Sequence, residues 1–288
     1  MGDQVKKLNE LENAIIQYVR PTSSPVALKM CKSEDKIPEE IKFPLRDLGL
    51  HWPVCMVFNA VARKKWIMGI GFDDLQCPLG NLALGLAEPP EAFLNGELQW
   101  SILPPGEANA QYSKSIKLLE YGKYDCLIAA PIEKADFDPD MILIFGTPAQ
   151  VTKLVQGRLF LTGGSLNSAA SLGATCSIQV AHTILNDECQ VVLPGSGPRC
   201  FGQIQDHEMC FTIPPSKFEV ISEGLKASTG LVAYDYPPDT VMNFEFEFPP
   251  SYKNFQEVLA GGGDINFNHE KEMAKYVEWK KKYDPYFE

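Results

Sequence analysis

The fold class is decided by the stretch Met141-Ile142-Leu143-Ile144-Phe145-Gly146-Thr147-Pro148. Its five consecutive apolar residues are typical of a strand that is buried on both faces. Thr147 and Pro148 are typical of a helix start, as the N-cap and the first-turn residue, and predict a helix to about Val155. A buried strand that leads directly into a helix predicts an α/β fold, with a mixed α+β arrangement as the alternative.

The rest of the chain alternates in the same way on both sides of this stretch. Apolar residues at helical or strand spacing, bounded by glycine and proline, define the further elements. The predicted strands are residues 24–30, 66–71, 125–130, 190–193, 210–213 and 234–251. The predicted helices are residues 3–19, 54–63, 166–173, 176–185, 216–226 and 269–282.

Three pairs of anchors recur along the chain at nearly constant offsets of 121, 123 and 125 positions. In that order the pairs are Cys55 with Cys176, Cys77 with Cys200, and Pro89-Pro90 with Pro214-Pro215. Upstream, the strand at 26–30 has a counterpart at 142–145. We therefore predict two pseudo-symmetric copies of a strand-helix-strand-helix unit, residues 1–125 and 126–233, packed as one body. Residues 234–288 form a C-terminal extension that ends in a predicted helix.

The composition excludes several kinds of partner. The 288-residue chain carries a formal charge of −11, which argues against binding to nucleic acid or to an anionic membrane surface. No apolar run approaches the ~20 residues that span a bilayer. Residues 1–18 lack the pattern of a secretory signal, so we expect a cytoplasmic protein. Residues 234–288 are the expected contact with a second copy or with a partner subunit.

Four segments resemble an uncharacterised prokaryotic family, domain of unknown function 169. They are Ser24 to Lys29, Cys77-Pro78-Leu79-Gly80, Asp138 to Leu154, and Ile213 to Phe218. The resemblance covers about residues 8–230 and implies a shared fold, but it carries no established activity. Family members often have Gly-Cys-x-Gly-x-Arg where this chain has Pro194-Gly195-Ser196-Gly197-Pro198-Arg199. The family cysteine therefore falls on Gly195, and the nearest thiol here is Cys200, which argues against a four-cysteine site in this chain.

The eight cysteines of the chain allow three interpretations. Pseudo-symmetry would bring Cys55, Cys77, Cys176 and Cys200 to one interface, where four thiolates suit zinc or an iron–sulfur cluster. No Cys-x-x-Cys pair supports a metal site, so the same residues are equally read as buried small side chains. The third interpretation is a single catalytic thiol, Cys77 or Cys176, activated at a helix N-terminus.

Two glycine-rich segments are candidates for binding an anionic small molecule. Gly197 and Arg199 would present backbone amides beside a guanidinium, which suits a carboxylate or a phosphate. Gly163-Gly164-Ser165 would do the same before a predicted helix. Ordinary turns explain both segments as well. Three functions stay open: an enzyme or redox protein with a cysteine-lined site, a cofactorless enzyme or binding protein for an anion, and a non-catalytic subunit of a complex.

Overall fold

The computed structural model describes residues 2–98, 103–229 and 250–264. Its centre is one six-stranded sheet with the order β2-β3-β1-β4-β6-β5. The strands are β1 (Val26–Cys31), β2 (Met68–Gly71), β3 (Cys126–Pro131), β4 (Met141–Gly146), β5 (Gln190–Val192) and β6 (Met209–Ile213). All six overlap a predicted strand.

Every pairing between these strands is antiparallel, so the fold is the mixed α+β alternative and not a parallel α/β sheet. β4 is buried along its whole length, as its apolar run predicts. The order runs β1, β3, β2 on one side of the central β1/β4 pair and β4, β6, β5 on the other. The duplication itself stays a prediction.

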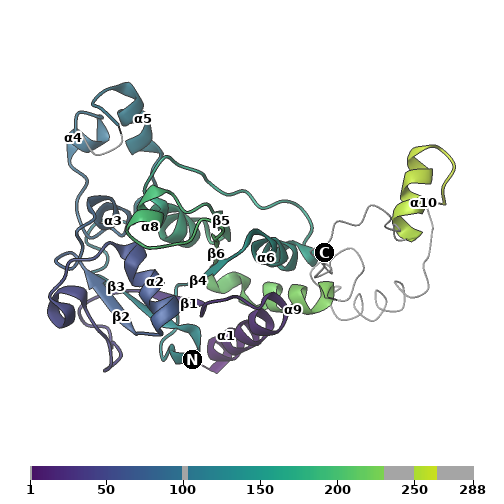
Figure 1. The fold of residues 1–288 in the computed structure, drawn as a ribbon, viewed down its shortest axis with the longest axis horizontal. Coiled ribbons are helices and arrows are strands. Elements are labelled where there is room, and N and C mark those ends of the chain that lie inside the picture. The colour runs from purple at the N-terminus through teal and green to yellow at the C-terminus, as the bar shows by residue number, and fades with distance from the viewer. Residues whose placement is uncertain (1, 99–102, 230–249, 265–288) are drawn as a thin grey trace.

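Helices cover both faces of the sheet (Figure 1). The helices are α1 (Gly2–Ala14), η1 (Ile15–Val19), η2 (Pro44–Leu48), α2 (Val54–Lys64), α3 (Pro78–Ala83), α4 (Glu91–Leu94), α5 (Glu107–Ser115), η3 (Ile132–Lys134), α6 (Pro148–Phe160), η4 (Ser177–His182), α7 (Thr183–Asn186), α8 (Ser196–Cys200), η5 (Pro215–Lys217), α9 (Phe218–Ser228) and α10 (Pro250–Leu259). α1, η1, α6 and α9 pack on one face, and α2, η4 and the end of α3 pack on the other.

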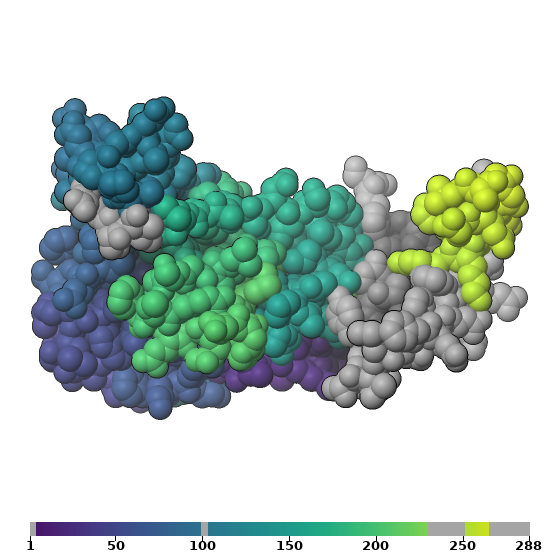
Figure 2. All heavy atoms as spheres, turned by 45° about the horizontal axis from the view of Figure 1, so that its top comes forward, coloured from purple at the N-terminus to yellow at the C-terminus, as the bar shows by residue number. Residues whose placement is uncertain are grey.

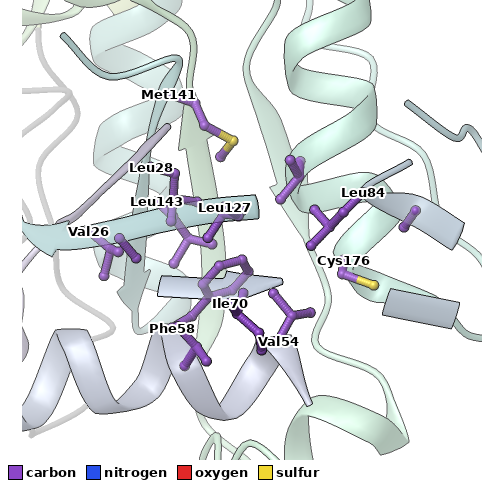
Figure 3. Packing of buried hydrophobic residues seen from close by; sticks show 14 of the residues in the cluster. Val26, Leu28, Val54, Phe58, Ile70, Leu84, Leu127, Met141, Leu143 and Cys176 are labelled. Atoms are coloured by element: carbon purple, nitrogen blue, oxygen red, sulfur yellow. The ribbon is translucent and has the colours of Figure 1, made fainter. Parts of the chain in front are cut away.

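The core on the α2 face follows the alternation of each strand. Figure 3 shows Leu28 of β1, Leu127 of β3 and Leu143 of β4 packed around Phe58 of α2. Each of these side chains is at most 1% exposed. Cys176 lies in the same cluster, so this face of the sheet supports the candidate site.

The helix after β4 begins as predicted and runs further. Thr147 and Gln150 form a capping box, in which the side chain of each accepts or receives the backbone bond of the other. α6 then continues to Phe160, five residues beyond Val155. It packs closely on α9, because a Cβ added at Gly224 would lie 1.9 Å from the carbonyl oxygen of Gly157.

The helix predicted at residues 166–173 is wrong. This segment contains no helix and leads along β5, where the Ser168 hydroxyl accepts a 2.8 Å hydrogen bond from the Val191 amide. Serine, asparagine and glycine fill the segment, and these residues favour local bonds over helix. The next helix begins at residue 175.

The predicted strand at 234–251 and the predicted terminal helix at 269–282 lie almost wholly outside the described residues. Within that part of the extension that the structure describes, α10 covers Pro250–Leu259 and is followed by Gly261. In the described part of the chain, no helix combines the length and the apolar character needed to cross a membrane.

Candidate functional site

Three cysteines lie at the N-terminal ends of three helices. Cys55 is the second residue of α2, Cys77 is the N-cap of α3, and Cys176 directly precedes η4. Unpaired backbone amides at a helix start stabilise negative charge, and thiolate is the form that they favour in a cysteine. Each of the three positions therefore offers part of what a metal-binding or reactive cysteine needs.

Two sulfur–carbonyl contacts connect these helices crosswise. The Cys55 thiol donates to the Gly197 carbonyl of α8 at 3.9 Å, and the Cys176 thiol donates to the Leu79 carbonyl of α3 at 4.0 Å. Gly197 and Leu79 each occupy the second position of their helix. The turn after α8 also approaches α2, since a Cβ at Gly202 would lie 3.0 Å from the Cβ of Cys55.

The thiols of Cys55, Cys77 and Cys176 lie near enough to influence one another. Burial raises the pKa of Cys55 to about 12, and the Cys77 thiol adds to this rise. Burial also raises the pKa of Cys176, with further contributions from Cys77 and then Cys55. Backbone amides at both helix starts act in the opposite direction on these pKa values, including those of Met56 and Ser177. Cys55 and Cys176 are therefore protonated at neutral pH unless a cation compensates for the burial.

Tyr112 is a further residue at this site that the sequence did not single out. It lies on α5, in the arm formed by α4 and α5 that stands out from the body in Figure 2. Its side chain is 7% exposed, and burial, Cys176 and Cys77 raise the pKa of its phenol. No motif marks it, because its position depends on how the arm folds back over α3 and η4.

Position 195, and not Cys200, occupies the place in α8 that Cys77 occupies in α3. Gly195 is the N-cap of α8, and a Cβ there would lie 3.1 Å from the hydroxyl of Thr175, the neighbour of Cys176. Cys200 is exposed at the other end of this helix. The structure thus brings together Cys55, Cys77 and Cys176, and it places Cys200 apart from their helix starts. Among the described residues, no three His, Cys, Asp or Glu side chains lie close enough to hold a single metal ion.

Arg199 is bonded within its own loop. Its guanidinium donates to the carbonyls of Gln205 at 2.5 Å and Glu208 at 3.5 Å, and it lies 3.8 Å from the Asp206 carboxylate. Gly197 uses its carbonyl to accept from Cys55. Anion binding by Gly197 and Arg199 stays a prediction, and these contacts show that Arg199 also holds the loop that leads to β6.

The Gly163-Gly164-Ser165 segment follows a helix and does not precede one. Gly163 and Gly164 have φ values of +62° and +80°, and the Gly163 amide donates to the Leu159 carbonyl at the end of α6. This is the negative end of a helix dipole, which disfavours an anion. The helix start that motivated this candidate is therefore absent, and ligand binding by the segment stays a prediction.

Comparison with known proteins places the chain among proteins without an assigned role. An uncharacterized protein of Methanocaldococcus jannaschii is 26% identical over 226 residues, which cover 77% of this chain and 95% of that protein. No solved structure matches. The model of domain of unknown function 169, described as uncharacterised ArCR, matches residues 14–224 and so leaves out the C-terminal extension. The chain belongs to this uncharacterised family.

Proposed function

We propose that this protein binds an iron–sulfur cluster through Cys55, Cys77 and Cys176 and leaves one iron without a protein thiolate. The observation that carries the proposal is the convergence of three thiols from three helix starts, buried beside one another. Such clusters are held by cysteine thiolates, and amide hydrogen bonds to the sulfurs tune their potential. The amides that act on Cys55 and Cys176 supply such bonds.

A cluster fits the spacing of these thiols better than zinc does. Tetrahedral zinc, with Zn–S distances of about 2.3 Å, needs sulfurs about 3.8 Å apart. In a cubane cluster each thiolate binds a different iron, so the sulfurs are more widely spaced. The described thiols influence one another without forming a single-ion group. Zinc is one outcome of the test below.

The iron without a thiolate gives the site an open coordination position for a small anionic molecule, which makes the protein an enzyme or a redox protein. An oxygen atom of a carboxylate or hydroxyl group is the ligand that we propose there. The Tyr112 phenol lies beside Cys77 and Cys176 and is the nearest identified group that could donate a proton or a hydrogen bond to it. Its raised pKa keeps this phenol protonated at neutral pH.

We also propose that the site formed by duplication in a cytoplasmic protein. The mirrored strand order and the crosswise contacts of Cys55 and Cys176 support two related halves. In that relation Cys77 corresponds to Gly195, so one half supplies two thiols and the other supplies one. The eight free cysteines support a reducing compartment.

The test is anaerobic purification followed by iron and sulfide analysis and visible spectroscopy. We expect about four irons per chain, visible absorption, and a three-iron form in electron paramagnetic resonance after mild oxidation. Cys55→Ser, Cys77→Ser and Cys176→Ser should each lose most of the iron. Cys200→Ser is the matched control, because its exposed thiol lies at the other end of α8, and it should retain the cluster.

Two results would overturn the proposal. The first is protein that contains neither iron nor sulfide after anaerobic reconstitution, with or without bound zinc. The second is equal loss of iron in Cys200→Ser and in the three other variants, which would place the cluster elsewhere.

A further inference from the structure

We infer that Cys31 and Cys126 form a redox-active dithiol, which closes to a cross-strand disulfide when it reacts with a small disulfide such as oxidised glutathione. Cys31 is the last residue of β1 and Cys126 is the first residue of β3. The two are directly opposite each other in the antiparallel register, which ends at this pair.

The two side chains lie on the same face of the sheet. Met30 and Leu127, their respective neighbours, pack into the core on the α2 face, so Cys31 and Cys126 project to the opposite face. There they pack with Ile128, and their thiols hydrogen-bond to each other. Opposite residues of an antiparallel pair have Cβ atoms about 4.5–5.5 Å apart, and a disulfide needs about 3.5–4.5 Å. A small closing movement therefore suffices.

The two thiols differ in access, which assigns their roles. Cys31 is fully buried, whereas Cys126 is partly exposed. On its other side Cys126 is paired with Gly71 of β2, which has no side chain to cover it. The hydrogen bond from Cys31 lowers the pKa of Cys126, and this effect exceeds the opposing effects of burial and of nearby carboxylates such as Asp125. Cys126 is the attacking thiol and Cys31 the resolving thiol.

The reaction is a pair of thiol–disulfide exchanges. The Cys126 thiolate attacks one sulfur of oxidised glutathione, forms a mixed disulfide and releases one glutathione thiolate. Cys31 then loses its proton, attacks the Cys126 sulfur and releases the second glutathione. The two protein thiols lose two electrons and two protons in total, and one oxidised glutathione becomes two reduced molecules.

This dithiol is separate from the cysteines of the proposed cluster. Cys176 belongs to the core on the α2 face, and Cys31 belongs to the small cluster on the opposite face. Oxidation of the dithiol can therefore be measured whether or not iron is bound.

The experiment uses the full wild-type chain, incubated with a series of ratios of oxidised to reduced glutathione. Free thiols are then alkylated, and the protein is digested with trypsin. Cleavage after lysine isolates the two cysteines in the peptides 30–32 and 124–134. We expect these peptides to appear joined, with loss of two hydrogens, about 2 Da, relative to their sum. In Cys31→Ser, glutathione should stay on Cys126, and in Cys126→Ser the 30–32 peptide should stay unmodified.

Cys200→Ser is the control and should form the same joined peptide, because the exposed Cys200 takes no part in the exchange. The inference is overturned if wild-type protein retains glutathione on Cys126 without joining the peptides. It is also overturned if peptide 124–134 stays alkylated at every ratio. Both readouts come from the wild-type chain, so they stand even if a serine variant fails to fold.

Discussion

The buried ion pair between Arg63 and Glu208 offers a quantitative test of the packing around the site. Arg63 of α2 donates to both carboxylate oxygens of Glu208 at 2.6 and 2.7 Å. The Glu208 side chain is 3% exposed, and the Arg63 side chain is 32% exposed. The Gln205 amide also donates to Glu208 at 2.8 Å. The pair therefore fastens α2, which carries Cys55, to the loop between α8 and β6.

The unequal burial of the partners predicts unequal costs of removing them. Arg63→Ala leaves a buried carboxylate with much of its charge uncompensated, which costs about 3–5 kcal/mol of unfolding free energy. Glu208→Ala leaves a guanidinium that is partly in water and still bonded to Asn59, so the penalty is closer to that of an ordinary lost hydrogen-bonding group, about 1–3 kcal/mol. Arg63→Ala should therefore be the more destabilising change by about 2 kcal/mol.

Urea unfolding of the reduced, metal-free protein measures this difference. Lys64→Ala is the matched control, because it removes an exposed positive charge from the adjacent position of the same helix. We expect it to change the unfolding free energy by less than about 0.5 kcal/mol. The reasoning is refuted if Arg63→Ala costs no more than the control, or if Glu208→Ala costs more than Arg63→Ala.

Three further results are expected. The metal-free protein should lose stability as pH rises from about 9 towards 12, at about 1.4 kcal/mol per pH unit for Cys55, since this thiol holds its proton to higher pH when folded, as urea midpoints would show. Gly224→Ala should cost more than about 3 kcal/mol in urea unfolding, because its Cβ would meet Gly157, whereas Gly262→Ala should be nearly neutral. Gly195→Cys should supply a fourth thiolate and suppress the three-iron signal.

Local sequence patterns determined the strands and most helices. The apolar run at 141–145 and the Thr147–Pro148 helix start are local features, and both appear in the structure as β4 and α6. The run indicates burial on both faces but contains no information about strand direction. Direction depends on the connections between strands, so an α/β fold and an antiparallel α+β fold were equally compatible with the pattern.

Nonlocal features were beyond the reach of the sequence patterns. The pairing of Cys31 with Cys126 depends on register between strands that are far apart in the chain. Tyr112 reaches the thiols only because α5 folds back over them. Residues 166–173 had helix-like apolar spacing, yet the free edge of β5 offered an amide that Ser168 satisfies. In each case a tertiary partner decided the outcome.

The alternative readings of the cysteines apply to different residues and do not compete for the same ones. Cys210 lies in β6, wholly buried in the core, and fits the reading of a small buried side chain. Cys55 and Cys176 are also buried, but backbone amides at helix starts already favour their thiolates while burial opposes them. A bound cation reverses that balance, because it compensates the charge that burial penalises. The same metal would gain little from Cys210, which has no third thiol beside it among the described residues. Helix-start geometry, and not burial or cysteine count, is therefore the property that singles out Cys55, Cys77 and Cys176.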